Sequence, residues 1–220
     1  MNSKKLIIYC AFFVCLAVGF WFFLFRGTEN WKSKSVTLST VKPFSFTTQD
    51  NQTFTERDMQ GKVCVVEYFF TTCKGICPRM NANMHKIYNT FKDEPDFMIV
   101  SHTCDPETDS VPVIKHYSDS LKVNNHRWVF LTGRKDSLYA AARYSYLLDD
   151  PKNGLDNIKD QFIHTQFFAV VDKNGQVRGQ IYDGLKEDEL AKLKTDIATL
   201  LKEKQGKSGF NSSIFTNNPQ

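Results

Sequence analysis

Apolar and polar residues alternate along the chain in blocks that predict strands and helices in turn. The run from Val63 to Phe70 is apolar except for one charge, which is typical of a buried strand. A helical pattern follows from Pro78 to Phe91, and proline suits the first turn of a helix. Further strands are predicted at residues 97–101, 127–132, 165–172 and 177–182, and further helices at 109–121, 136–148 and 187–204.

Two turn signals complete the predicted order of elements. Residues 44–55 alternate around Asp50-Asn51, which predicts an N-terminal hairpin, and Lys173-Asn174-Gly175 predicts a second hairpin near the C-terminus. Strands and helices that alternate and end in a hairpin and a helix predict an α/β sandwich around a central mixed sheet. This order of elements is the thioredoxin-like arrangement.

The N-terminus has the pattern of a membrane anchor. Leu6 to Phe25 is twenty residues without a charge, which is long enough for one transmembrane helix, and Lys4 and Lys5 before it favour a cytoplasmic start. A cleaved signal peptide is the alternative, but no small-residue cleavage site follows the apolar run. We predict an anchor at residues 1–26, a tether at 27–42, a domain at 43–205 and a disordered tail at 206–220.

The charge balance excludes one class of partner. The chain has 28 Lys and Arg against 24 Asp and Glu, and three of the basic residues flank the apolar run. The remaining charge is nearly balanced, so the sequence has no basic patch of the kind that binds nucleic acid.

The most informative chemistry lies at the junction between the first buried strand and its helix. Cys73 and Cys77 are four residues apart and are followed by Pro78. If the helix begins near Cys73, both sulfur atoms share one face, and the helix N-terminus favours the thiolate. Such a pair can exchange disulfides or bind a soft metal. A purely structural disulfide is the other interpretation, but a loop this short gains little stability from one.

The remaining cysteines and histidines add one candidate ligand. Cys64 lies within the apolar strand and is expected in the core, whereas Cys104 is an odd thiol. Two thiolates and an imidazole suit copper. Of the five histidines, His164 stands out because it directly precedes an apolar strand.

Four segments together resemble the SCO/SenC family of membrane-anchored, thioredoxin-fold proteins that help to assemble the CuA centre of cytochrome c oxidase. The segments are Cys73-Lys-Gly-Ile-Cys77-Pro78, residues 101–109 with Asp105-Pro106-Glu107, Trp128-Val-Phe-Leu-Thr-Gly133, and His164 with the strand after it. They occur in the family's order over roughly residues 43–200.

The resemblance implies that Cys73, Cys77 and His164 bind copper as Cu(I) or Cu(II). It implies delivery of copper to cytochrome c oxidase subunit II or a related copper acceptor, with an upstream copper chaperone as a further partner. The apolar run and its basic flank predict a single-pass protein of the inner membrane, with its main domain on the periplasmic side. The family has Asp where this chain has Ile163, so Asp160 is the candidate for orienting the imidazole.

Two enzymatic interpretations stay open beside copper binding. A thiol–disulfide oxidoreductase would need Cys73 and Cys77 but not His164, although such enzymes normally have two residues between their cysteines rather than three. A thiol peroxidase would need an arginine near the reactive thiolate, and no matching arginine is evident upstream. The sequence therefore leaves it open whether the protein is an enzyme.

Overall fold

A computed structural model of the protein describes residues 3–25, 36–124, 126–163 and 165–206. The chain divides into two units, residues Met1–Ser35 and Val36–Gln220. The first unit contains helix α1 (Ser3–Phe25), whose apolar side chains are exposed wherever they are described. No helix among the described residues is long and apolar enough to cross a membrane.

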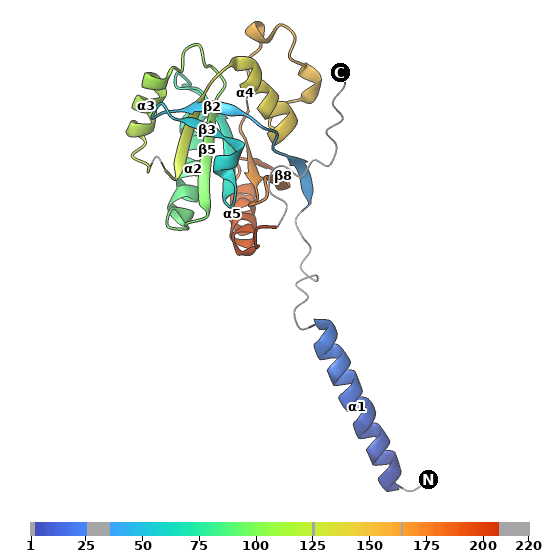
Figure 1. The fold of residues 1–220 in the computed structure, drawn as a ribbon. Helices are drawn as coiled ribbons and strands as arrows, with labels where there is room; N and C mark the ends of the chain where they lie inside the picture. The colour runs from blue at the N-terminus through green and yellow to red at the C-terminus, as the bar shows by residue number, and fades with distance from the viewer. Residues whose placement is uncertain (1–2, 26–35, 125, 164, 207–220) are drawn as a thin grey trace. The chain divides into compact units, whose positions relative to one another are not determined.

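The second unit is built on one mixed sheet of eight strands (Figure 1). In spatial order these are β1 (Thr37–Thr40), β8 (Gln176–Asp183), β7 (Phe167–Val171), β4 (Val63–Phe69), β5 (Phe97–Thr103), β6 (Trp128–Thr132), β2 (Ser45–Thr48) and β3 (Thr53–Thr55). The central strands β4, β5 and β6 are parallel, and all other pairs are antiparallel. The predicted mixed sheet with an N-terminal hairpin is confirmed.

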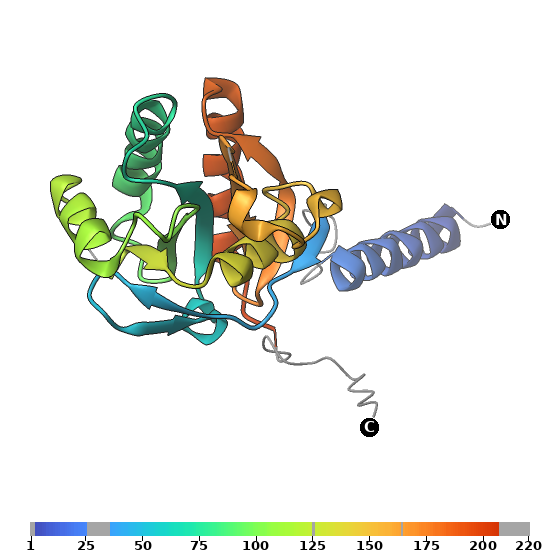
Figure 2. The same ribbon diagram turned by 90° about the horizontal axis from the view of Figure 1, so that it is seen from above.

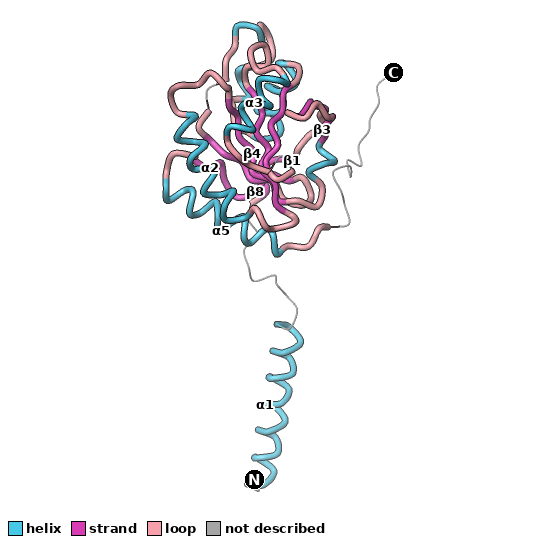
Figure 3. The backbone as a smooth tube through the Cα atoms, turned by 90° about the vertical axis from the view of Figure 1, so that its left-hand side faces the viewer, coloured by secondary structure: helices cyan, strands magenta, loops and turns pink. Residues whose placement is uncertain are grey.

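Helices cover both faces of the sheet (Figure 2). On one face lie α2 (Cys77–Phe91), α3 (Val111–Ser120) and α5 (Glu187–Lys202). On the other face α4 (Lys135–Ala141) continues into a π-helical turn, η3 (Ala142–Tyr146). Figure 3 shows α2 and α5 side by side, where Lys86 of α2 pairs with Glu187 of α5. Single 3-10 turns are η2 (Glu56–Met59), η4 (Pro151–Asn153) and η5 (Ile158–Asp160).

The strand that leads to the cysteine pair is buried along its whole length. Because side chains alternate across a strand, Val63, Val65 and Phe69 of β4 pack under α2 and α5. Cys64 and Tyr68 face the other way, into the core beneath α4. Because both faces of β4 are buried, its sequence is a continuous apolar run rather than an alternation of apolar and polar residues.

Three predicted boundaries are corrected. Residues 37–40, predicted as part of the tether, form β1 and pair with β8 at the edge of the sheet. The predicted helix 136–148 is α-helical only to Ala141, and the π turn after it ends at Tyr146, followed by Leu147 with a left-handed φ of 58°. Helix 109–121 begins at Val111. The predicted tail lies almost wholly outside the described residues.

Candidate metal centre

The cysteine pair lies in the loop that connects β4 to α2, after the carboxyl end of a central parallel strand. The strand ends at Phe69 and the helix begins at Cys77. Within the loop, the amide of Cys73 donates to the carbonyl oxygen of Phe70 at 3.2 Å and forms a turn. Pro78 occupies the first turn of α2, where a missing N–H costs nothing. The turn brings Cys73 back towards the N-terminus of the helix.

The prediction that both sulfur atoms share one helix face is wrong, because Cys73 precedes the helix. The loop brings the sulfur atoms together instead, and the Cys77 thiol donates a hydrogen bond to the Cys73 sulfur. Backbone amides of Gly75, Ile76 and Cys77 also donate to that sulfur. The Cys73 sulfur therefore lies where the unpaired amides of a helix N-terminus stabilise negative charge.

The two thiols have opposite electrostatic character. Partial burial raises the pKa of Cys73, but the hydrogen bonds from Cys77 and the backbone amides lower it, and the net pKa lies below that of an ordinary cysteine. Burial raises the pKa of Cys77 to about 12, and the hydrogen bond to Cys73 adds to the effect. Of the pair, Cys73 is thus the cysteine more inclined to ionise, and Cys77 is the one that keeps its proton.

A buried carboxylate holds the beginning of the loop. Asp109, which is fully buried, accepts the amide of Thr71 at 3.2 and 3.3 Å and the hydroxyl groups of Thr71 and Thr103. Asp109 is not the cap of α3: Ser110 occupies the N-cap position, and its side chain makes no capping bond. The motif at residues 101–109 was the only sequence signal for this role.

A second buried carboxyl group lies beneath the pair. Glu67 of β4 accepts a hydrogen bond from the hydroxyl of Ser101 at 2.7 Å, and that hydroxyl accepts the indole N–H of Trp128 at 2.8 Å. Burial raises the pKa of Glu67 to about 7, against a smaller lowering by Ser101. The charge of Glu67 in turn contributes to the raised pKa of Cys77. The sequence shows Glu67 only as the single charge of an apolar strand.

The other two cysteines of the domain are buried. Cys64 lies in the core, as predicted, and burial raises its pKa to about 12. Cys104 follows β5, and its thiol donates to the carbonyl oxygen of Phe69 at 3.3 Å. Burial and the nearby Cys77 raise the pKa of Cys104 well above its usual range. The pKa of both thiols is thus raised, whereas that of Cys73 is lowered.

The histidines divide by exposure. His116 and His126 are exposed, and His85 lies against Trp128 with ring centroids 5.1 Å apart. His102 is fully buried, neither ring nitrogen has a hydrogen-bond partner among the described residues, and burial lowers its pKa to about 3. None of these four is a better ligand candidate than His164, which lies outside the described residues.

The donor set fits a soft metal. Two sulfur atoms in mutual contact, one of them inclined to ionise, are the ligands that copper and zinc select. Among residues 3–25, 36–124, 126–163 and 165–206, no group of three or more His, Cys, Asp and Glu could hold a metal ion. Ile163 is buried and Asp160 is exposed, and the role of Asp160 beside His164 stays a prediction.

Comparison with known proteins identifies the family. Residues 32–201 match the family described as SCO1/SenC. The chain belongs to this family. The SCO1 protein homolog of Bacillus subtilis is 29% identical to this SCO1/SenC protein over 161 residues, which cover 71% of this chain and 80% of the relative.

Solved structures of the family share the fold. A SCO1/SenC family lipoprotein from Bacillus anthracis is 32% identical with a TM-score of 0.60, covering 74% of this chain and 96% of its own. BsSco, described as having a disulfide switch and as a member of the Sco family of cytochrome c oxidase assembly proteins, is 27% identical with a TM-score of 0.63, covering 77% and 98%. Yeast Sco1, solved with copper bound, shares the fold at 22% identity and a TM-score of 0.56, covering 78% and 100%. The predicted family and thioredoxin-like fold are confirmed.

Proposed function

We propose that this SCO1/SenC protein binds one copper ion through Cys73, Cys77 and His164, and that it delivers copper to, or prepares, the CuA site of cytochrome c oxidase. The observation that carries the proposal is the contact between the two thiols in the β4–α2 loop, where the Cys73 sulfur also receives backbone amides. Thiolates suit Cu(I), and an added imidazole accommodates Cu(II), so this donor set supports both states. The copper-bound structure of yeast Sco1 and the assembly role given for BsSco support the same function.

The acceptor we propose is cytochrome c oxidase subunit II or a related copper protein, with an upstream chaperone as the copper source. We also propose that residues 6–25 hold the protein in the inner membrane with the domain on the periplasmic side. This rests on the twenty uncharged residues of the sequence. Extraction of membranes with alkaline carbonate tests the anchor: an anchored chain stays in the pellet, and release into the supernatant contradicts it.

An anaerobic titration of the reduced full-length chain with copper tests the site. Wild type is compared with His164→Ala and with the double variant Cys73→Ser/Cys77→Ser. His116→Ala, at an exposed position of α3, is the matched control for the histidine, and Cys64→Ala, in the core, is the control for the cysteines.

We expect one tightly bound copper in wild type and both controls, no tight binding in the cysteine double variant, and weaker Cu(II) binding in His164→Ala. Tight binding that survives loss of both cysteines contradicts the proposed site. Wild-type affinity in His164→Ala contradicts the ligand role of His164.

One observation favours a second function, reduction of disulfides in target proteins. The lowered pKa of Cys73 beside a protonated Cys77 is the asymmetry that thiol–disulfide exchange uses, with Cys73 as the attacking thiolate. The Cys77 thiol would then resolve the mixed disulfide. Turnover of a disulfide substrate that needs both cysteines, is unchanged in His164→Ala and accompanies weak copper binding would favour this function over copper delivery.

A further inference from the structure

Residues 149–163, here called the 149–163 arm, lead directly to His164. The arm contains only the short turns η4 and η5, so backbone hydrogen bonds of regular structure do little to hold it. It packs beside α4 and the π turn that follows it (Figure 1). What fixes the arm must therefore be side-chain contacts.

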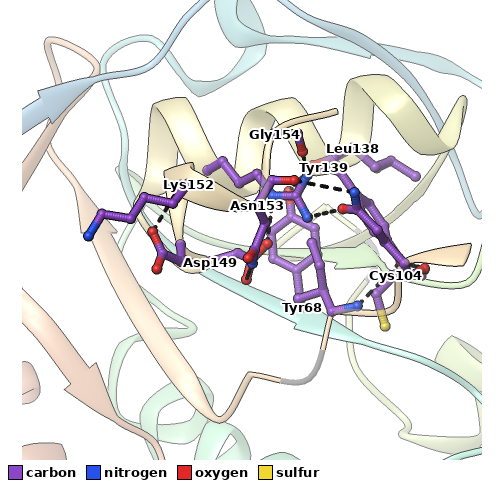
Figure 4. A network of polar contacts seen from close by, with 12 residues as sticks. Tyr68, Cys104, Leu138, Tyr139, Asp149, Lys152, Asn153 and Gly154 are labelled. Carbon is purple, nitrogen blue, oxygen red and sulfur yellow. Dashed lines mark hydrogen bonds and ion pairs between the residues drawn. The ribbon is translucent and has the colours of Figure 1, made fainter. Parts of the chain in front are cut away.

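Arg143 is the centre of those contacts. Its side chain is almost fully buried, although arginine is rarely buried without partners. The guanidinium donates to Asp149 at 2.6 Å, to the side-chain oxygen of Gln161 at 2.6 Å and to the carbonyl oxygen of Gly154 (Figure 4). All three partners belong to the arm, so one cation ties its beginning, middle and end together.

Tyr139 lies one helical turn before Arg143 and connects the end of the arm to the rest of the domain. The guanidinium carbon lies 5.4 Å from the centre of its ring. The Tyr139 hydroxyl lies 2.8 Å from the carbonyl oxygen of Cys104 and 3.2 Å from that of Gln161. The same hydroxyl accepts the amide of Ile163 at 3.4 Å. The Tyr139 hydroxyl oxygen thus contacts both the arm and the turn after β5.

Hydrogen bonds also connect the turn after β5 to the start of the cysteine loop. The amide of Cys104 donates to the carbonyl oxygen of Phe69 at 2.9 Å, and the Cys104 thiol donates to the same oxygen at 3.3 Å. Phe69 is the last residue of β4, directly before the loop that carries Cys73. A continuous chain of hydrogen bonds therefore runs from the cysteine loop through Cys104 to Tyr139 and on to Ile163.

We propose that Tyr139 is a positioning residue, whose hydroxyl sets the spacing between the cysteine loop and the chain segment that delivers His164. The inference rests on the proposed copper site. Ile163 is one peptide link from His164, so consecutive Cα atoms are about 3.8 Å apart and an ordered Ile163 restricts where its neighbour can lie. Groups that orient a metal ligand typically contribute about 10–100-fold to metal affinity. Since the imidazole matters most for Cu(II), loss of the hydroxyl weakens Cu(II) binding more than Cu(I) binding.

The test compares Tyr139→Phe with Tyr144→Phe in the full-length chain. Tyr139→Phe keeps the ring that packs on Arg143 and removes only the hydroxyl. Tyr144 lies on the same helical segment, with its ring under the Lys42 ammonium and outside the network, so it is the matched control. Each protein is titrated with Cu(I) and Cu(II) against competing chelators, and amide exchange at Ile163 is followed in the metal-free protein.

We expect Tyr139→Phe to lower Cu(II) affinity about 10–100-fold, to leave Cu(I) affinity near wild type and to speed exchange at Ile163, while Tyr144→Phe changes none of these. Unchanged Cu(II) affinity, or equal losses for Cu(I) and Cu(II), overturns the inference. If wild type itself binds no copper, the proposed function fails, and unchanged exchange at Ile163 in Tyr139→Phe would show separately that Tyr139 does not order the arm.

Discussion

The cysteine loop and the 149–163 arm are held in the domain by different means. The loop is short and is bounded by a fully buried strand and by a helix with proline in its first turn. The arm is longer and nearly without regular structure, and it depends on Arg143 and Tyr139. The sulfur pair is therefore set by local structure, whereas the segment leading to His164 depends on side chains of another element.

This difference has a consequence for copper chemistry. A site whose two sulfur atoms are fixed locally can keep Cu(I) even when the arm moves, because two thiolates suffice for Cu(I). If His164 is a ligand, as we propose, binding of Cu(II) requires the arm as well. A variant that perturbs the arm should thus lose Cu(II) binding but keep Cu(I), whereas a variant that perturbs the loop should lose binding of both.

The largest effect on stability is expected from removing the Arg143 side chain, which holds three parts of the arm. Arg143→Met removes the cation and leaves Asp149, Gly154 and Gln161 without their shared donor. Loss of one partner of a buried ion pair costs about 3 kcal/mol or more of unfolding free energy. Urea unfolding measures the loss.

Arg134→Met is the control, because the Arg134–Asp136 pair is exposed and should contribute little. A loss in Arg143→Met no larger than in this control would show that Arg143 does not hold the arm.

The next largest effect expected is a pH dependence of the unfolding free energy, which comes from the Glu67 carboxyl group beneath the cysteine loop. The pKa of Glu67 is raised from 4.5 to about 7, so the folded state keeps a proton that the unfolded state releases between these values. Stability from this group is therefore present at pH 5 and is lost as pH rises through 7, by about 2–3 kcal/mol. Gln at position 67 resembles the protonated form.

We expect Glu67→Gln to be as stable as wild type at pH 5 and more stable at pH 8, by urea unfolding at both pH values. The matched control is Glu94→Gln at an exposed position. A Glu67→Gln variant with the same pH dependence as wild type would contradict the assignment of this titration to Glu67.

A smaller loss is expected from loosening the cysteine loop. Asp109→Asn keeps the shape of the side chain but replaces one acceptor oxygen by a donor, facing three donor groups. We expect a loss of about 1–2 kcal/mol, together with faster amide exchange at Thr71 and no change at Ile163. Equal changes at both amides would show that the contacts of Asp109 do not act on the cysteine loop alone.

The smallest effect is expected at His102, a residue that belongs to neither the cysteine loop nor the arm. The buried His102 ring is surrounded by Phe44, Phe46, Tyr68 and Tyr146, with no hydrogen bond among the described residues. His102→Phe removes two unsatisfied polar atoms and should raise stability by about 1 kcal/mol without changing copper affinity. Thermal unfolding and a copper titration check both points, and a loss of copper affinity would connect His102 to the site.

The sequence predicted the cysteine side of the site better than the arm. The strand at Val63, the helix after Pro78 and the paired thiols follow from local patterns, and the structure confirms the elements. Cys73 was wrongly placed on the helix because the length of the turn between strand and helix leaves no periodic signal. Strand β1 was missed since it is short, has three polar residues among four, and pairs only at the sheet edge.

The contacts that hold the arm could not be predicted from local sequence patterns. Arg143 and Tyr139 look like ordinary positions of an amphipathic helix, and their partners lie between 6 and 35 residues away in sequence. The π turn that places Arg143 inward has no propensity signal of its own. Asp109 was visible in a motif, but its contacts with Thr71 required the folded arrangement of two strand ends.

X-ray absorption of the copper-loaded full-length chain, compared with His164→Ala, identifies the atoms that bind the metal. We expect two sulfur scatterers and one imidazole in wild-type Cu(II) protein, with the imidazole signal lost in His164→Ala and both sulfur atoms retained. A third sulfur would assign Cys104 to the site, and an imidazole that persists in His164→Ala would assign another histidine. Either result would contradict a centre made of Cys73, Cys77 and His164.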